Sequence, residues 1–154
     1  MSTAPTVTLE PARDGDLDAL VVLRIAAMRD SLERLGRFDP ERARARFAAA
    51  WDAQHTRHVL ADGVRIGCVV VRPLDDGLLL DHLYLLPSHQ GRGVGSAVLR
   101  EVLAHADAQG LHVRVSALRD SDANRFYLRH GFELSDEGEW DNHYMRPAPG
   151  HCRG

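Results

Sequence analysis

The sequence predicts one α/β (α+β) domain in which a mixed central sheet of about seven strands is flanked by about four helices. The chain has 154 residues, 44% of them hydrophobic, so it can bury one core without disulfides or metals. Its apolar periodicity switches between strand and helix in the order β-α-α-β-β-β-α-β-α-β-β. No repeat or linker interrupts that order. We therefore expect a single domain over residues 1–146 and a flexible tail over 147–154.

The first segments predict a strand and two helices. Residues 6–9 alternate as a half-buried strand does. Residues 17–35 follow with helical apolar spacing, and Asp14 or Asp16 can cap them. A proline suited to the first helical position opens the next helix, over 40–51.

Three strands are expected next. Residues 58–61 and 64–71 are largely apolar, and Asp62-Gly63 between them is a strong hairpin signal. A third apolar run covers 78–85 and follows the turn residues Asp75-Asp76-Gly77. The first two strands are therefore expected to be joined directly as a hairpin.

The remaining chain predicts helices at 94–108 and 123–128 and strands at 111–117, 132–134 and 139–146. A glycine follows each of these helices closely and is expected to end it. The residues Asp136-Glu137-Gly138 are expected to form the turn between the last two strands.

The composition argues against several classes of protein. A net charge of −3 at pH 7 is unlike that of a nucleic-acid-binding module. No apolar run approaches the length of a membrane span and the N-terminus does not resemble a signal peptide, so we expect no membrane partner and a cytoplasmic location. Cys68 and Cys152 have no CxxC partner, so neither a metal site nor a disulfide is predicted. All 19 basic residues are arginine, which is typical of a GC-rich bacterial coding sequence and excludes a lysine Schiff base.

The most informative motif is Gln90-Gly91-Arg92-Gly93-Val94-Gly95, between an apolar strand and a helix. A glycine-rich turn that opens a helix presents backbone N–H groups, which can bind a pyrophosphate. The Gly-Lys-Ser/Thr of nucleotide hydrolases is missing. The motif also follows the fourth strand, whereas a dinucleotide fold has its glycines after the first. A nucleotide-binding protein of another fold is therefore the disfavoured alternative.

Two segments resemble the GNAT superfamily of N-acetyltransferases. The segment from Leu83 to Ser96 is similar to its acetyl-CoA signature, which is Gln or Arg, two residues, Gly, one residue, and Gly or Ala after the fourth strand. The segment from Asn124 to Phe132 resembles the family's aromatic-Tyr, three-residue spacer, Gly-Phe pattern. The resemblance covers residues 6–146 by element order and is specific over 83–132. It implies acetyl-CoA as the acyl-donor cosubstrate, bound where the fourth and fifth strands splay apart.

The resemblance also implies which residues hold the donor. Backbone groups of Leu83, Tyr84 and Leu85 would bind the pantetheine arm as an added strand. The residues that would surround the pyrophosphate are Gln90, Gly91, Arg92, Gly93, Val94, Gly95 and Ser96, with glycines that allow close backbone approach. Asn124 is a further cofactor candidate, because many relatives have an asparagine near this point, whereas Asp120 occupies the usual position here.

For the catalytic groups, Tyr127 resembles the family's general acid for the leaving thiolate. A phenol suits this role because its pKa of about 10 keeps it protonated at neutral pH; the alternative is a packed helix aromatic. Asp81 and His82 interrupt an apolar strand and are the candidate bases. Successive strand residues face opposite sides, so at most one of the two points to the substrate. Deprotonation by bulk water is a third option.

The implied activity is direct acetyl transfer to the primary amine of a small molecule, such as an amino acid, an amine metabolite or an antibiotic. The alternative is a non-catalytic acyl-CoA-binding or regulatory module on the same fold. The resemblance implies that the first two helices and the last strands build the acceptor pocket, and it leaves a homodimer possible. The donor motifs do not identify the acceptor.

Overall fold

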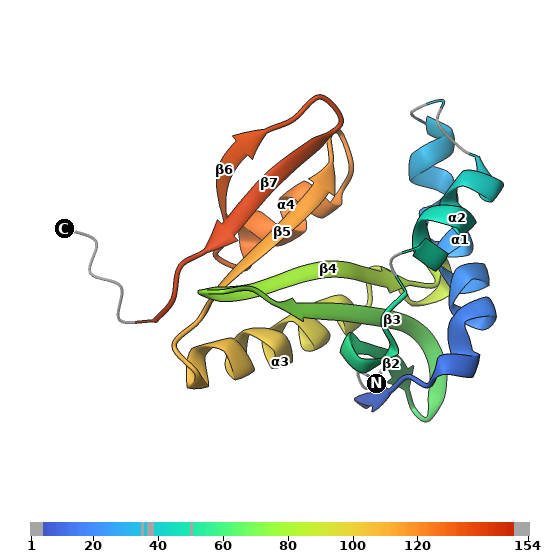
Figure 1. The fold of residues 1–154 in the computed structure, drawn as a ribbon, viewed down its shortest axis with the longest axis horizontal. Helices are drawn as coiled ribbons and strands as arrows, with labels where there is room; N and C mark the ends of the chain where they lie inside the picture. Colours follow the sequence, from blue (N-terminus) through green and yellow to red (C-terminus); the bar gives the residue numbers. More distant parts are fainter. Residues whose placement is uncertain (1–4, 35, 37–38, 50, 150–154) are drawn as a thin grey trace. The chain divides into compact units, whose positions relative to one another are not determined.

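The computed structural model describes residues 5–34, 36, 39–49 and 51–149 (Figure 1). Within these residues it contains four α-helices and seven strands, in the sheet order β1-β2-β3-β4-β5-β7-β6. This confirms the predicted mixed sheet and its element order. The chain divides into two compact units, one of residues 1–70 and 82–99 and the other of 71–81 and 100–154. The single domain over 1–146 stays a prediction, and most of the expected tail lies outside the described residues.

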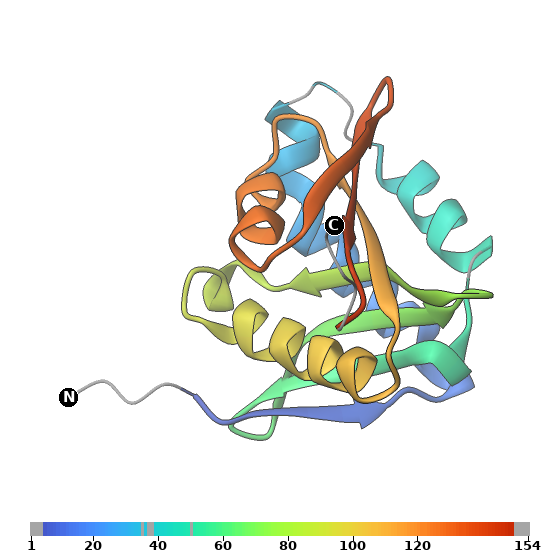
Figure 2. The same cartoon turned by 90° about the vertical axis from the view of Figure 1, so that its left-hand side faces the viewer.

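The first unit is built on an antiparallel hairpin with an added edge strand. β2 (Thr56–Ala61) and β3 (Val64–Pro73) are joined at Asp62 and Gly63, whose φ values of 51° and 83° are those that a tight two-residue hairpin needs. β1 (Val7–Pro11) runs antiparallel beside β2 (Figure 2). The predicted hairpin is therefore confirmed.

Two helices bury one face each in this unit. Leu20 and Val21 of α1 (Leu17–Arg34) are almost fully buried, whereas the next residue, Val22, is 64% exposed. They form a core with Phe47 of α2 (Pro40–Ala49) and with Cys68 of β3. Burial raises the pKa of the Cys68 thiol to about 12, so it remains protonated at neutral pH and serves as a small core residue.

The second unit contains a parallel ladder and an antiparallel hairpin. The first residues of β4 (Gly77–Leu85) pair in parallel with β5 (His112–Leu118). The ladder ends at the Leu80–Val115 pair, although β5 continues and pairs from Val113 to Leu118 with β7 (Asp141–Arg146). Such an early end is what the predicted splayed strand pair requires. α4 (Ala123–Arg129) lies beside β5 (Figure 1).

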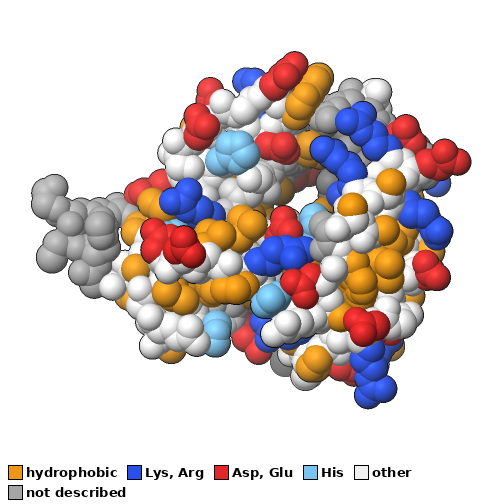
Figure 3. Space-filling model, in the orientation of Figure 1, with side chains coloured by type: hydrophobic (Ala, Val, Ile, Leu, Met, Phe, Trp, Pro, Cys, Tyr) orange, Lys and Arg blue, Asp and Glu red, His pale blue; other side chains and the backbone are white. Residues whose placement is uncertain are grey.

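The last hairpin differs from the expected one. β6 (Glu133–Glu137) continues through the residues expected to turn, and Asp136 and Glu137 pair with His143 and Asn142 of β7. The turn therefore lies at 138–140. A bulge after Leu134 accommodates the pairing, and acidic side chains are tolerated because this strand lies at the edge of the sheet and is exposed throughout. Figure 3 shows acidic side chains at the outer end of this hairpin.

α3 (Val94–Ala108) begins and ends at the expected residues. Near its end, Asp107 accepts two hydrogen bonds from the Arg146 guanidinium of β7, at 2.7 and 3.0 Å. This bidentate geometry is the strong form of the ion pair. No described helix is long and apolar enough to cross a membrane.

Replacing Asp107 by asparagine is expected to lower the melting temperature at pH 7 by about 2–4 °C, because a partly exposed pair contributes on the order of 1 kcal/mol. The hydrogen bonds from Arg146 lower the pKa of Asp107 in the folded protein. The stabilisation is therefore complete above the unfolded carboxyl's pKa and is lost as the pH falls through the folded value. Thermal unfolding should show wild type and variant converging in acid.

The matched control is Glu101→Gln, which neutralises an exposed acid on the same helix and should leave the melting temperature unchanged. A difference for Asp107→Asn that stayed constant down to low pH would contradict the assigned ion pair.

Candidate functional site

The glycine loop folds as a strand-to-helix turn. A short 3₁₀ turn over Pro87–His89 follows β4, and α3 begins at Val94. Gly91 and Gly93 have φ values of 76° and 80°, which disfavour any residue with a Cβ. Apart from the adjacent residues of the chain, no described atom lies within 4 Å of a Cβ built at either glycine, so open space adjoins the backbone here.

This loop ends at a helix start that suits an anion. The Ala97 N–H donates to the Gly93 carbonyl at 3.0 Å and closes the first helical turn. The first turn of α3 carries no acidic residue. Backbone N–H groups and the positive end of the helix dipole together favour a phosphate at such a terminus. Of the predicted loop residues, Gln90, Gly91, Arg92 and Gly93 are exposed, Gly95 and Ser96 are half-buried, and Val94 is buried.

Gln90 has a structural role besides the predicted one. Its side-chain amide donates to the Leu85 carbonyl at 2.8 Å and so ties the loop to the last residue of β4. The next N–H, that of Leu86, donates to the Ile66 carbonyl at 2.8 Å. These bonds fix the loop relative to the strand that precedes it.

The end of β4 approaches β3 closely. Leu83, Tyr84 and Leu85 are half-buried. A Cβ at Gly67 of β3 would overlap the Tyr84 carbonyl oxygen and lie 2.7 Å from Leu85 Cδ2. Glycine at position 67 therefore permits this approach, and a larger residue would displace the segment predicted to hold the pantetheine arm.

His82 lies in a cluster of aromatic and cationic side chains. Its Nδ1 is 2.8 Å from the Tyr84 hydroxyl, and the two rings are stacked with centroids 5.3 Å apart. Phe47 of α2 meets the His82 ring edge-on at 5.6 Å. Arg24 of α1 donates from Nε to the Tyr84 hydroxyl at 3.2 Å and lies 5.4 Å from the centroids of both the Phe47 and Tyr84 rings.

Asp81 has a different partner. Its carboxylate accepts a hydrogen bond from Arg72 Nε of β3 at 2.8 Å, and both side chains are partly exposed. Of the two candidate bases, Asp81 therefore lies in an ion pair with an arginine, and His82 lies within hydrogen-bond distance of a tyrosine hydroxyl.

Tyr127 is buried in the second unit, with 6% of its surface exposed. Its ring packs against Phe132 and Tyr144 with centroid distances of 5.5 and 6.3 Å. The ring of Tyr127 therefore packs as an ordinary helix aromatic would. The role of its hydroxyl as the general acid stays a prediction.

The Asn124 amide is fully used by the chain. Its Nδ2 donates to the Leu118 and Ser121 carbonyls, both at 2.8 Å. Its Oδ1 accepts from Asn142 Nδ2 at 3.0 Å and from the Tyr144 hydroxyl at 2.7 Å. The side chain thus pins the β5–α4 turn to β7. Its predicted contact with the cofactor is untested.

Sequence reasoning missed Arg24. It follows the buried Leu20 by four residues and Val21 by three, so it lies on the apolar face of α1. An arginine on a buried stripe was the signal that could have identified it.

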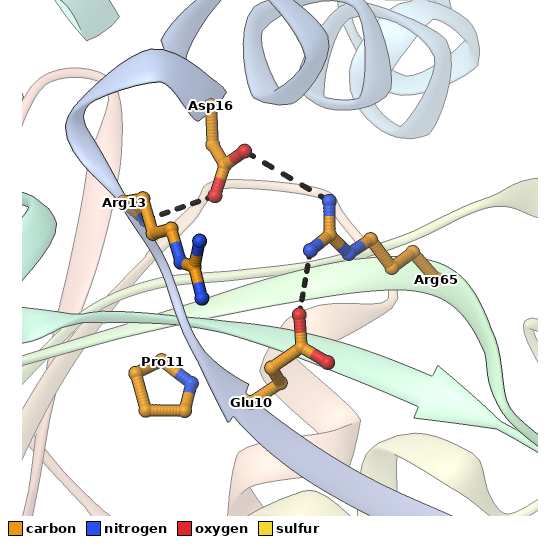
Figure 4. Close-up of a pocket in the computed structure, with 5 residues that line it drawn as sticks. All are labelled: Glu10, Pro11, Arg13, Asp16 and Arg65. Carbon is orange, nitrogen blue, oxygen red and sulfur yellow. Dashed lines mark hydrogen bonds and ion pairs between the residues drawn. The ribbon is translucent and has the colours of Figure 1, made fainter.

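A charged pocket of about 490 Å³ in the first unit is lined by Glu10, Pro11, Arg13, Asp16 and Arg65 (Figure 4). Arg65 bridges Glu10 and Asp16, and the buried His58 contacts Asp16 Oδ2 at 2.9 Å. The hydrogen bond with His58 is the main cause that lowers the pKa of Asp16. These contacts tie the start of α1 to the sheet. We therefore interpret the residues that line the pocket as a structural ion-pair cluster.

The described residues contain no group of three or more His, Cys, Asp or Glu side chains that could hold a metal ion.

A family model described as "Acetyltransferase (GNAT) domain" matches residues 53–134. A search of curated proteins found no match.

Several solved structures share the fold. The PaiA N-acetyltransferase from Thermoplasma acidophilum, in complex with coenzyme A, is 16% identical with a TM-score of 0.76, over 92% of this chain and 99% of that one. An acetyltransferase from Thermus thermophilus is 18% identical with a TM-score of 0.75, over 95% and 99%. Arabidopsis thaliana Naa50, in complex with the bisubstrate analogue CoA-Ac-MVNAL, is 21% identical with a TM-score of 0.63, over 90% and 96%.

Replacing Asn124 by alanine is expected to cost roughly 2–3 kcal/mol of unfolding free energy, because part-buried partners on both sides of the amide lose their hydrogen bonds. Denaturant unfolding measures this loss. Ser121→Ala, which removes one hydroxyl from the same turn, should cost less than half as much. An unchanged stability for Asn124→Ala would contradict the structural role of the amide.

Proposed function

We propose, because the chain belongs to the GNAT acetyltransferase family, that it is an acetyl-CoA-dependent N-acetyltransferase for the primary amine of a small molecule. The observation that carries the proposal is the Gln90–Ser96 loop, in which two left-handed glycines lead from a strand into a helix start without acidic residues. An amino acid, an amine metabolite or an antibiotic is the proposed acceptor class.

The residues present fit the donor. The open space beside Gly91 and Gly93 admits phosphate oxygens, which the N–H groups at the start of α3 can bind. Arg92 is exposed in the same loop and can add a charge-assisted hydrogen bond. In the proposal, the backbone of Leu83, Tyr84 and Leu85 pairs with the pantetheine arm as a strand would. Acetyl-CoA supplies the thioester that is cleaved.

The proposed transfer is direct. A base removes a proton from the ammonium form of the acceptor, and the neutral nitrogen attacks the thioester carbonyl carbon. The C–N bond forms, the C–S bond breaks, and the thiolate takes a proton from the Tyr127 phenol. The second proton of the nitrogen returns through water to the Tyr127 phenolate, and the base releases the first proton to solvent. Cys68 is fully buried and its pKa is about 12, which argues against an acyl-cysteine intermediate.

His82 is the proposed base. Its imidazole is half-buried on β4 among side chains of α1 and α2, the helices that the family uses for the acceptor. Asp81 instead accepts a hydrogen bond from Arg72 Nε at 2.8 Å, so one of its carboxylate oxygens is already engaged in an ion pair. Histidine is also the side chain whose ordinary pKa lies nearest to neutral pH.

A second candidate is a non-catalytic acyl-CoA-binding module on the same fold. The observation in its favour is the burial of Tyr127 among aromatic rings, which accounts for this residue without chemistry. A measurement of turnover distinguishes the proposed enzyme from the non-catalytic binding module.

The donor-binding proposal predicts that isothermal titration gives heat with acetyl-CoA and none with ATP. Gly93→Val should weaken acetyl-CoA binding at least about tenfold, because a Cβ at positive φ distorts the loop and fills its open side. Gly110→Val is the matched control, since Gly110 has a similar φ of 69° but follows α3. Equal losses from both variants would show general destabilisation and would remove the loop's assigned role.

The acid role predicts that Tyr127→Phe lowers turnover about 10²-fold or more while the acetyl-CoA affinity changes little. Free-thiol release across a panel of small amines and peptides measures this. Tyr144→Phe removes a phenol oxygen from the same aromatic cluster and should retain turnover. Unchanged turnover in Tyr127→Phe would eliminate the role, and wild-type binding without thiol release from any amine would favour the binding module.

A further inference from the structure

We propose that Ser116 and His143 form a nucleophile–base pair at which the chain accepts an acyl group from an activated ester. The two residues lie on neighbouring strands of the second unit, Ser116 on β5 and His143 on β7. The acetyl transfer to amines described above uses neither side chain. The inference therefore goes beyond the proposed function and is tested independently of it.

The pair is held at the distance that proton transfer needs. Ser116 Oγ lies 2.6 Å from His143 Nδ1, within the range over which a base can take the proton of a nucleophile. The two residues are also directly opposite each other in the antiparallel β5–β7 ladder. That ladder pairs every residue from Val113 to Leu118, so the backbone fixes the separation of the two side chains.

A third residue extends the pair into a row across three strands. His143 is also opposite Asp136 of β6, and β7 lies between β5 and β6 in the sheet. Opposed residues have Cβ atoms about 5 Å apart, so an acid lies on the side of His143 away from Ser116. A carboxylate at this separation favours the imidazolium that forms when His143 takes the serine proton. Serine, histidine and aspartate thus follow one another in the order that nucleophilic catalysis uses.

The hydrogen bond between Ser116 and His143 can form with either residue as the donor, because a hydroxyl both donates and accepts. The form in which Ser116 donates is the reactive one, since Nδ1 then carries the lone pair that takes the proton. In this form the imidazole proton is on Nε2, and the negative charge of Asp136 on that side favours it. The pair is exposed, so the two tautomers can exchange through water.

The surroundings of Ser116 admit an acyl donor and include a cation. Ser116 is exposed whereas its neighbours Val115 and Ala117 are buried, so its side chain lies on the solvent face of β5. Arg114 is exposed on the same face, about 7 Å along the strand, and donates from Nε to His112 Nε2 at 3.3 Å. A guanidinium has further N–H groups, which can stabilise the oxyanion that forms on the attacked carbonyl.

The proposed step transfers an acetyl group from an aryl ester to the serine. Ser116 Oγ attacks the carbonyl carbon while His143 Nδ1 takes the hydroxyl proton. The bond from Oγ to the carbonyl carbon forms, and the bond from that carbon to the phenol oxygen breaks. The leaving phenolate takes the proton that His143 received. The products are an O-acetylserine and a phenol.

The first test treats the full-length protein with p-nitrophenyl acetate and locates the acetyl groups by peptide mass spectrometry. The chain contains no lysine, so no side-chain amine competes, and Cys152→Ala removes a competing thiol. Ser116 should be acetylated at least about tenfold faster than Ser88, which is 2.9 Å from the sequence-adjacent His89 in a turn outside the sheet. Equal labelling of Ser88 and Ser116 would overturn the proposal.

The second test removes the members of the pair in turn. His143→Gln should slow the acetylation of Ser116 at least about tenfold, because general-base assistance is lost, and Ser116→Ala should abolish the label. The matched control is Ser135→Ala, which removes a hydroxyl that donates to the His143 carbonyl at 3.1 Å and should leave the rate unchanged. An unchanged rate in His143→Gln, or an equal loss in Ser135→Ala, would overturn the assigned base.

A third variant tests the row without altering the pair itself. Asp136→Asn lies on an exposed edge strand, so the protein should fold, and it should slow the acetylation of Ser116 about two- to fivefold. An unchanged rate would overturn the role of Asp136. These measurements use neither coenzyme A nor an amine acceptor. Labelling of Ser116 in a protein that acetylates no amine would therefore support this inference while the proposed function fails.

Discussion

The left-handed backbone at Gly91 and Gly93 is the constraint on which the turn from β4 into α3 depends. The chain has to pass from the end of β4 into α3 within a few residues, and both glycines have φ values near 80°. An L-residue with a side chain would cost roughly 1–2 kcal/mol at each position. The loop therefore has no side chain at these two positions just before α3 begins, and this is where we propose that the phosphates of the donor bind.

Much of this fold is encoded locally and could be predicted. The turn at Asp62 and Gly63 and both ends of α3 follow from residues that determine their own backbone conformation. The last hairpin could not be predicted as well, because pairing of Asp136 and Glu137 across the sheet edge outweighs their turn preference. Local signals are reliable here until a long-range partner competes with them.

The candidate site was predictable in its sequence positions and only partly in its contacts. The residue types at His82 and Tyr127 suggest an acid and a base without reference to any neighbour. Arg24 and Phe47 contact side chains of β4 that are dozens of residues away in the sequence. No local sequence pattern encodes such tertiary contacts. Asn124 lies in a segment that resembles a family motif and is predicted to contact the cofactor. In the structure its amide is already hydrogen-bonded to Leu118, Ser121 and β7. A motif position thus identifies a residue but does not assign its role.

The buried thiol of Cys68 has a practical consequence. Its side chain is 0% exposed and burial raises its pKa to about 12, so a thiol-specific reagent can reach it only when the core opens. Once Cys152 is replaced, the labelling rate of Cys68 in the native protein reports the frequency of that opening. Cys68 can therefore serve as a built-in probe of local opening in the native protein. Its labelling rates with and without acetyl-CoA can show whether acetyl-CoA makes that opening rarer.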